Sequence, residues 1–256
     1  MDEFAALRKE LELWECTGVG CQLWWRDDDL TTVTPQLLRM QEVSERNNVP
    51  ALLAVIPGQA TSTLGNDTAH MGSFDFAQHG WLHQNHEANS RAKSEFGIGR
   101  SIDASVEDMR RGSRQMVELF GKRYINVFVP PWNHLSTELP PYMETLDYLG
   151  LSRHVDQEKI LMPPSIVDVN THIDILQWAT RPSLQKPDVI IAQLAQLLCQ
   201  QREGRAVESP IGILSHHRVM ADDSWQFLDE LFSFTGRYHC VNWIRPSELF
   251  RPTFVT

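Results

Sequence analysis

The 256-residue sequence predicts an α/β protein, folded as a distorted (β/α) barrel of about seven strands. Three observations predict this fold. Short apolar runs of strand length alternate with stretches in which apolar residues have helical spacing. The runs are continuously apolar, as in parallel strands that are buried on both faces. No linker-like segment or internal repeat divides residues 1–256, so we expect a single domain; an open doubly wound sheet is the alternative.

Seven segments have the length and composition of strands. Each is rich in aliphatic or aromatic residues. Pro57-Gly58 and Pro130-Pro131 close two of them, because Pro and Gly interrupt regular structure. The predicted strands are residues 21–25, 51–56, 73–77, 125–129, 173–178, 211–215 and 238–243.

Helical spacing fills the gaps between these runs. Thr34 has the side chain of an N-cap and Pro35 suits the first helical position, so a helix is expected to begin there. Gly121 and Gly204 follow two other helical segments, as expected of C-caps. The other predicted helices cover 106–120, 189–201 and 225–234, and one more ends near residue 150.

Composition limits the function classes. With 42% hydrophobic residues and eight Trp the chain can bury a sizeable core. A net charge of −10 and a pI of about 5.4 argue against nucleic acid or an anionic membrane as partner. Four cysteines without CxxC spacing are typical of reduced thiols, and neither a signal peptide nor an apolar run of about 18 residues is recognisable. We therefore expect a cytoplasmic protein without a transmembrane segment, and the sequence leaves its oligomeric state open, a homo-oligomer included.

Titratable and ligand-type side chains follow four of the predicted strands. The carboxyl ends of parallel strands meet at one rim of the fold, and active sites of α/β proteins lie there. The residues are Asp27, Asp28 and Asp29 after the first strand; His79, His83 and His86 after the third; Pro131, Trp132, Asn133 and His134 after the fourth; and His216 and His217 after the 211–215 strand. Their convergence predicts a catalytic site at this rim.

His79 and His83 form an HxxxH pattern, which on a helical turn places both imidazoles on one face. Two imidazoles and a carboxylate hold a metal while leaving positions open for water and substrate, and Asp28 can supply the carboxylate. An HxxxH alone also occurs without a metal, but its combination with the aspartates and the late histidine pair favours one. His86, seven residues after His79, is left open as a ligand or an assisting group.

The three adjacent aspartates also indicate a cation. Carboxylates crowded into one site do not all ionise cheaply unless a positive charge is present. Trp24-Trp25, immediately before them, indicates a buried strand rather than an exposed acidic turn. A divalent metal would balance the charge and lower the pKa of water to about 7.

At these residues the sequence resembles the polysaccharide deacetylase superfamily, also called the NodB homology domain. The motif Thr-Phe-Asp-Asp-Gly resembles residues 25–29, and His-Ser-x-x-His resembles 79–83. Arg-Pro-Pro-Tyr resembles 129–132, and Leu-x-x-His resembles 213–216. The order and spacing match from about residue 20 to 220. The resemblance implies the barrel fold of this family and a single catalytic domain over 1–256.

The resemblance also implies a mechanism of metal-assisted amide hydrolysis. Asp27 would be the general base, and Asp28, His79 and His83 would hold the metal. Zn²⁺ is expected from the ligand types, and Fe²⁺, Co²⁺ or Ni²⁺ suit the same set.

The remaining roles follow in the same way. The backbone N–H of Trp132 would stabilise the oxyanion, and His216 or His217 would be the general acid. The sequence leaves that choice open, because neighbouring residues of a strand point to opposite faces. The expected substrate-binding residues are Trp81, His86, Pro131, Asn133 and Trp178.

Three departures from the family pattern stand out. Asp29 replaces the glycine of the first motif. Val129 replaces the arginine of the third, so Arg26 or Arg181 is expected to substitute for it. The fourth motif, an Asp-Trp pair, corresponds at best to Gln177-Trp178.

The leading functional prediction is removal of an N-acetyl or similar N-acyl group from a sugar or a sugar-linked precursor. The variant pattern resembles single-domain members found in O-antigen and other surface-polysaccharide gene sets. Hydrolysis of another amide, such as an N-formyl sugar or a small amide metabolite, is the second hypothesis. The third is a non-catalytic carbohydrate-binding role, which the missing motif arginine favours.

Overall fold

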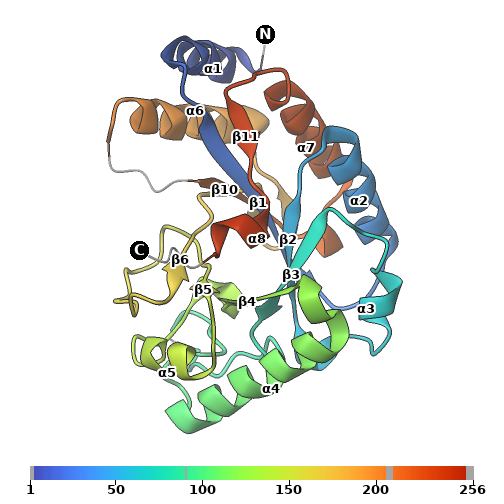
Figure 1. The fold of residues 1–256 in the computed structure, drawn as a ribbon, viewed down its shortest axis with the longest axis vertical. Helices are drawn as coiled ribbons and strands as arrows, with labels where there is room; N and C mark the ends of the chain where they lie inside the picture. Colours follow the sequence, from blue (N-terminus) through green and yellow to red (C-terminus); the bar gives the residue numbers. More distant parts are fainter. Residues whose placement is uncertain (1–2, 90, 206–209, 252–256) are drawn as a thin grey trace.

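The computed structural model of the protein describes residues 3–89, 91–205 and 210–251. Within these ranges nine strands form one sheet in the order β6-β5-β4-β3-β2-β1-β10-β7, and β11 pairs with the start of β1. Every neighbouring pair in this sheet is parallel. The sheet curls on itself with the longer helices around its outside (Figure 1). The predicted α/β fold is therefore confirmed as an incomplete barrel.

The strands and helices alternate along most of the chain. The sheet strands are β1 Cys21–Leu30, β2 Ala51–Val55, β3 Phe74–His79, β4 Tyr124–Val129, β5 Gly150–Leu151, β6 Val167–Asp168, β7 Ile173–Asp174, β10 Ile211–Ser215 and β11 Val241–Trp243. A separate hairpin consists of β8 Leu176–Trp178 and β9 Pro182–Leu184. The helices are α1 Ala5–Thr17, α2 Pro35–Asn47, α3 Leu64–Asp67, α4 Ile102–Phe120, α5 Pro140–Thr145, α6 Pro187–Arg202, α7 Asp222–Thr235 and α8 Pro246–Leu249. Four 3₁₀ turns in these ranges are η1 Pro57–Gln59, η2 Gly121–Arg123, η3 Pro131–Asn133 and η4 His217–Val219.

Most predicted elements occur, with local corrections. The Thr34 hydroxyl accepts a hydrogen bond from the N–H of Leu37, so it is the expected N-cap of α2. The predicted strand 173–178 divides into β7 and β8, which belong to different sheets. The prediction of a helix that ends near residue 150 is wrong, because α5 already ends at Thr145. Gly150 instead begins β5, and a side chain at this position would collide with the Phe250 ring.

Helix α1 was not among the predicted elements, although its apolar residues have helical spacing. Leu7, Leu11 and Trp14 are buried, and the Trp14 indole donates a hydrogen bond to the Leu198 carbonyl of α6 at 3.1 Å. The charged residues between them obscure the pattern. The helix therefore packs through a narrow apolar stripe.

Both faces of β1 are buried, and alternation along the strand decides which face each side chain takes. Trp24 lies on the inner face of the curled sheet and meets Phe250 edge-on, with ring centroids 6.2 Å apart. Trp25 lies on the outer face and packs against Phe232 of α7 at 4.9 Å. The next residues continue this alternation, so the side chain of Arg26 is directed inward. This alternation determines which of the aspartates that follow face inward and which face the helices.

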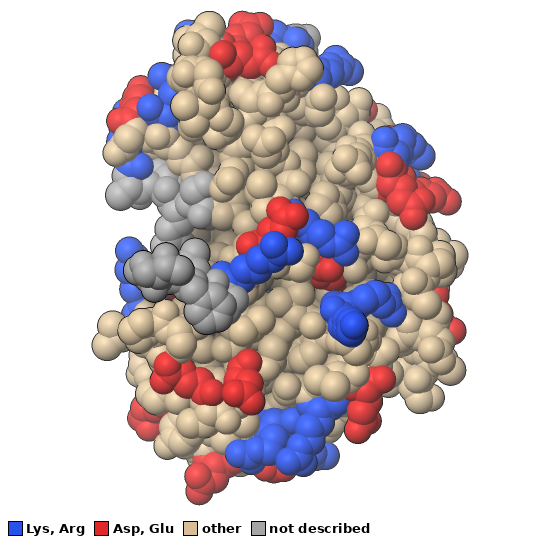
Figure 2. Space-filling model, viewed as in Figure 1, with Lys and Arg blue, Asp and Glu red and all other residues tan. Residues whose placement is uncertain are grey.

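The face of the molecule drawn in Figure 2 carries mixed charge. Lys and Arg are interspersed with Asp and Glu on the face in Figure 2, and neither sign forms a broad continuous field there. No helix of the described residues is long and apolar enough to cross a membrane.

Candidate metal centre and active site

A pocket of about 460 Å³ lies at the carboxyl ends of β1, β3, β7 and β10. The position agrees with the rim at which the sequence places the titratable residues. Predicted site residues in its lining are Asp28, His79, His83, Trp132, Asn133, Trp178 and His216, and Asp29, His154, His172 and Asp174 join them.

Asp29, His79 and His83 form a cluster that could hold a metal ion. In the described chain it is the one group of three or more His, Cys, Asp or Glu residues whose ligand atoms lie close enough together. One ligand atom of each lies within 4.8 Å of those of the others. The Nε2 atoms of His79 and His83 lie 3.3 and 3.5 Å from the same oxygen, Oδ1 of Asp29. This oxygen is buried and has no hydrogen-bond partner within the described part of the chain. A carboxylate and two imidazoles thus converge on one point.

The hydrogen bond on the far side of His79 fits a metal ligand. Its Nδ1 lies 3.0 Å from the Val129 carbonyl oxygen, which only accepts, so Nδ1 carries the hydrogen. In the neutral ring Nε2 then presents its lone pair to Asp29. Such an outer hydrogen bond fixes the tautomer of metal-binding histidines. The donor set therefore fits a divalent cation.

The electrostatics of the cluster also call for a positive charge. Burial disfavours the protonated form of His79, but the nearby Asp28 and Asp29 outweigh it and raise the pKa of His79 above 6.5. Burial would raise the pKa of Asp29, yet the three nearby histidines bring it well below the usual value. Burial and the charge of His79 lower the pKa of His83 to about 4. A proton on His79 balances the carboxylates in the same place where a metal would.

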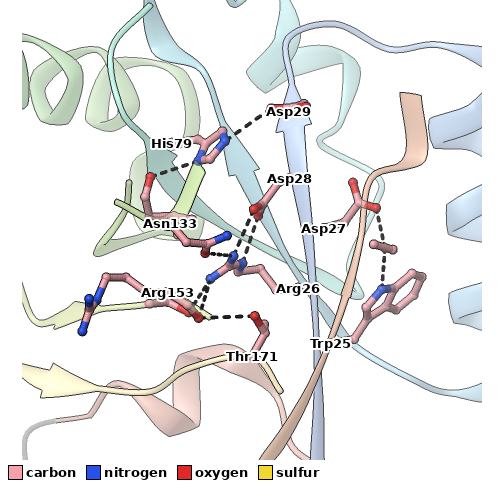
Figure 3. Close-up of polar contacts among 12 residues, drawn as sticks. Trp25, Arg26, Asp27, Asp28, Asp29, His79, Asn133, Arg153 and Thr171 are labelled. Atoms are coloured by element: carbon pink, nitrogen blue, oxygen red, sulfur yellow. Dashed lines mark hydrogen bonds and ion pairs between the residues drawn. The ribbon is translucent and has the colours of Figure 1, made fainter. Parts of the chain in front are cut away.

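Asp28 does not occupy the place that the sequence analysis assigned to it. Its carboxylate faces inward and pairs with the fully buried Arg26, whose Nε and Nη2 lie 3.0 Å from the two carboxylate oxygens (Figure 3). The residue beside the histidines is instead Asp29, at the end of β1, where φ is +76°. This left-handed backbone conformation lies within a register shift between Asp27 and Leu30, where the regular alternation of β1 is broken, and the Asp29 carboxylate faces His79 there.

Arg26 connects three strand ends around Asp28. Besides the carboxylate it donates to the Ser152 hydroxyl and to the Asn133 side-chain oxygen, both at 2.8 Å. Arg181, the other candidate to replace the motif arginine, is exposed in the turn between β8 and β9. Arg26, and not Arg181, is therefore the arginine that pairs with Asp28 in the pocket.

Asp27 lies on the opposite face of β1, fully buried and away from the pocket. It accepts hydrogen bonds from the Ser215 hydroxyl at 2.5 Å and from the backbone N–H of His217 at 2.9 Å. Its other oxygen contacts Nδ1 of His217, which is also fully buried. Neither Asp27 nor His217 lines the pocket, so their prediction as base and acid does not fit the structure. Asp27 shares the face of β1 that carries Trp25 and packs against the helices, and His217 contacts Asp27 there from the turn that follows β10.

His216 points into the pocket, beside two residues that follow β7. Its ring meets Trp178 edge-on at 4.6 Å, and the Trp178 indole donates to Asp174 at 2.7 Å. Burial raises the pKa of Asp174, although the charge of His216 acts in the opposite direction. Asp174 was missed in the sequence. Its spacing of four residues before Trp178 was the available signal for an Asp-Trp pair.

Three other predicted residues lie outside the pocket lining. Trp81 packs under the Arg111 guanidinium at 4.6 Å, and the backbone N–H of His86 donates to the Ser94 carbonyl. Pro131 is buried against Gly80. The helical spacing assumed for 79–86 is wrong, because β3 ends at His79 and a loop follows.

Trp132 and Asn133 lie where the sequence analysis expects them. Both have left-handed backbone conformations, with φ of 55° and 60°, in the turn η3 after β4. The Trp132 ring packs against His83 with centroids 4.2 Å apart. This turn therefore forms one wall of the pocket, next to the metal-ligand candidates.

Comparisons with known proteins bear on the fold. No family model matches the sequence, and no curated protein matches it. The structure is similar to a protein from Mycobacterium smegmatis assigned as a polysaccharide deacetylase, with a TM-score of 0.68, 17% identity, and coverage of 91% of this chain and 90% of that one. It is also similar to the peptidoglycan deacetylase PdaC of Bacillus subtilis, with a TM-score of 0.53, 11% identity and 90% coverage of both chains.

A third similar structure is a mutant, with restored activity, of a pseudoenzyme of the CE4 family. Its TM-score is 0.55 at 12% identity, with coverage of 91% of this chain and 68% of that one. These structural neighbours are deacetylases and relatives of the CE4, or NodB, type, so the chain has the incomplete barrel fold that the resemblance implied.

Proposed function

We propose that this protein is a metal-dependent hydrolase that removes an N-acetyl or similar N-acyl group from a sugar. The observation that carries the proposal is the cluster of Asp29, His79 and His83 on the wall of a pocket that Asp28 and His216 also line. Its fold, shared with polysaccharide and peptidoglycan deacetylases, supports the same reaction class.

Asp29, His79 and His83 would hold the metal in this proposal. Zn²⁺ suits one carboxylate and two imidazoles, and Fe²⁺, Co²⁺ and Ni²⁺ suit them as well. A divalent ion supplies Lewis-acid polarisation of the acyl oxygen and makes water more acidic.

Asp28 is the general base in this proposal, in place of Asp27. It lines the pocket next to the ligand Asp29, and the two contacts from Arg26 fix its orientation. Its carboxylate would take a proton from the water that attacks the acyl carbon. Arg26 would thus serve in place of the arginine absent at Val129.

His216 is the general acid in this proposal. An amine leaves an amide only after it gains a proton. Of the two adjacent histidines, His216 and His217, His216 is the one whose imidazole reaches the pocket. Trp178, whose indole donates to Asp174, packs edge-on against the ring and restricts its position. The backbone N–H of Trp132, in the η3 turn, would donate to the acyl oxygen as negative charge develops there.

The aromatic residues of the pocket favour a sugar as the substrate. Trp132 and Trp178 provide apolar walls for a sugar ring or an acyl methyl, and Asn133 provides a polar edge. We further propose a sugar-linked precursor of a surface polysaccharide, handled in the cytoplasm, as the resemblance implies. A non-catalytic role loses its main support, because Arg26 takes the place of the missing arginine beside Asp28.

The test is acyl release from a panel of N-acetyl and N-formyl amino sugars, free and linked to a carrier. Protein reloaded with Zn²⁺ or Co²⁺ is expected to release acetate from at least one N-acetyl sugar, and chelator-stripped protein is not. Release of formate alone would assign the second amide class. No release from any member by folded, metal-loaded protein would contradict the proposed function.

A further inference from the structure

The segment that carries His83 is a loop rather than a helix. Gly80 has φ of +58° and His83 has φ of +55°, so the backbone turns twice between the end of β3 and the second histidine. A loop without helical hydrogen bonds does not by itself fix a side chain to the accuracy that a metal ligand needs. Something outside the loop must hold His83 in place.

Glu95 supplies that hold from a segment twelve residues further along the chain. Its carboxylate accepts three hydrogen bonds, from the backbone N–H groups of Trp81 at 3.1 Å, Leu82 at 2.7 Å and His83 at 3.1 Å. Glu95 is fully buried, and these three partners are all main-chain amides. Successive N–H groups turned toward one anion form a stable concave site for it.

The carbonyl side of the same loop is held by the turn η1. The N–H of Gly58 donates to the Trp81 carbonyl at 2.9 Å, and the Gln59 side chain donates to the Leu82 carbonyl at 2.6 Å. The loop is therefore bonded on both sides, and Glu95 accounts for all three N–H groups of residues 81–83.

Gly80 provides independent support for a close approach of Glu95. A Cβ atom built on Gly80 would lie 2.2 Å from an oxygen of Glu95 and 2.5 Å from the Pro131 ring. The position directly after His79 must therefore lack a side chain for the carboxylate to reach the amides. The family motif has serine at this position, and the close approach of Glu95 and Pro131 leaves no room for that side chain here.

We infer that Glu95 is a positioning residue for the metal centre, which holds His83 in its ligating place by binding the amides of the loop. The inference rests on the proposed metal site. It assigns to Glu95 no contact with substrate. Burial of a carboxylate is costly unless it is fully hydrogen-bonded, so the loop and Glu95 stabilise each other.

The test is the affinity of the metal-free protein for Zn²⁺, measured by competition with a chromophoric chelator. Glu95→Gln keeps the shape but turns an NH₂ group toward backbone N–H donors. We expect it to weaken Zn²⁺ binding by about 10–100-fold, the range for groups that support metal ligands. Glu87→Gln is the matched control. Glu87 is a largely buried carboxylate of the same segment that accepts the N–H of Gly99 at 2.7 Å, away from His83.

A role confined to folding would lower the stability of the metal-free variant while the folded protein kept the wild-type Zn²⁺ affinity; that result overturns the inference. Amide hydrogen exchange of residues 81–83 in metal-free protein gives a second readout, and faster exchange in Glu95→Gln than in Glu87→Gln is expected. If Glu95→Gln does not fold, Glu95→Asp replaces it. Wild-type affinity there overturns the inference as well. If the wild type itself binds no Zn²⁺, the result contradicts the proposed function rather than the role of Glu95.

Discussion

Replacing Asp28 with Asn lowers turnover by about 10²–10⁴-fold, the usual contribution of a general base, and leaves metal binding nearly unchanged. Asp28 lines the pocket but is paired with Arg26, while the ligand atoms belong to Asp29 and the histidines. Asn keeps the volume and one acceptor for Arg26 but does not take up a proton. Steady-state turnover and Zn²⁺ affinity of the same preparation measure the two effects separately.

Asp27→Asn is the matched comparison for Asp28→Asn, because the residues are neighbours of the same type on opposite faces of β1. Asp27 accepts hydrogen bonds from Ser215 and His217, so its replacement leaves a buried donor without a partner. We expect a loss of about 1–3 kcal/mol in the free energy of unfolding and a smaller loss of turnover than for Asp28→Asn. The reverse order of turnover losses would restore Asp27 as the base.

Replacing His216 with Gln lowers hydrolysis of an N-acetyl sugar by about 10²–10⁴-fold, because the leaving amine then lacks its proton donor. The same variant is expected to hydrolyse an activated aryl acetate at a rate much closer to that of the wild type. A phenolate leaves without protonation, so its departure does not need the imidazole. The ratio of the two rates measures the acid role apart from binding.

His217→Gln is the control for His216→Gln. His217 is fully buried against Asp27 and does not reach the pocket, so its replacement is expected to lower stability and to leave the ratio of amide to ester hydrolysis unchanged. An unchanged ratio for His216→Gln, or a changed ratio for His217→Gln, would contradict the assignment of the acid.

The general fold could be predicted because its central strands are continuously apolar and are separated by helices with recognisable caps. Thr34 caps α2 as expected, and 51–55, 124–129 and 211–215 are strands. Strands β5 and β6 have only two residues each, too few for a pattern to register. They form through pairing with β4 and with each other, which is a property of the folded sheet.

The rim and its histidines could be predicted, but the roles of the three aspartates could not. The family motif has two adjacent aspartates and this chain has three, so the sequence allows two alignments. The alternation of side chains along a strand resolves such a choice of alignment when one face of the strand is polar and the other apolar. Trp24 and Trp25 are both buried in β1, so nothing in the sequence marks its inner face. The same burial on both faces of β10 left His216 and His217 unresolved.

The roles of Glu95 and Arg26 could not be predicted from the sequence, because they depend on contacts between distant parts of the fold. Glu95 acts on a loop twelve to fourteen residues away through main-chain amides, which carry no sequence signal. The sequence marks Arg26 only through the absence of an arginine at Val129. Its contacts with Ser152 and Asn133 depend on how β4 and β5 are placed around β1.

Metal content per chain tests the central claim most directly. The wild type, Asp28→Asn and Asp29→Ala would be purified without a metal-carrying tag, equilibrated with one equivalent of Zn²⁺ and analysed after removal of free ion. We expect about one ion per chain in the wild type and in Asp28→Asn, and none in Asp29→Ala, because Asp29 supplies the carboxylate beside His79 and His83. No bound ion in the wild type, or an ion lost from Asp28→Asn and kept by Asp29→Ala, would contradict the metal centre described here.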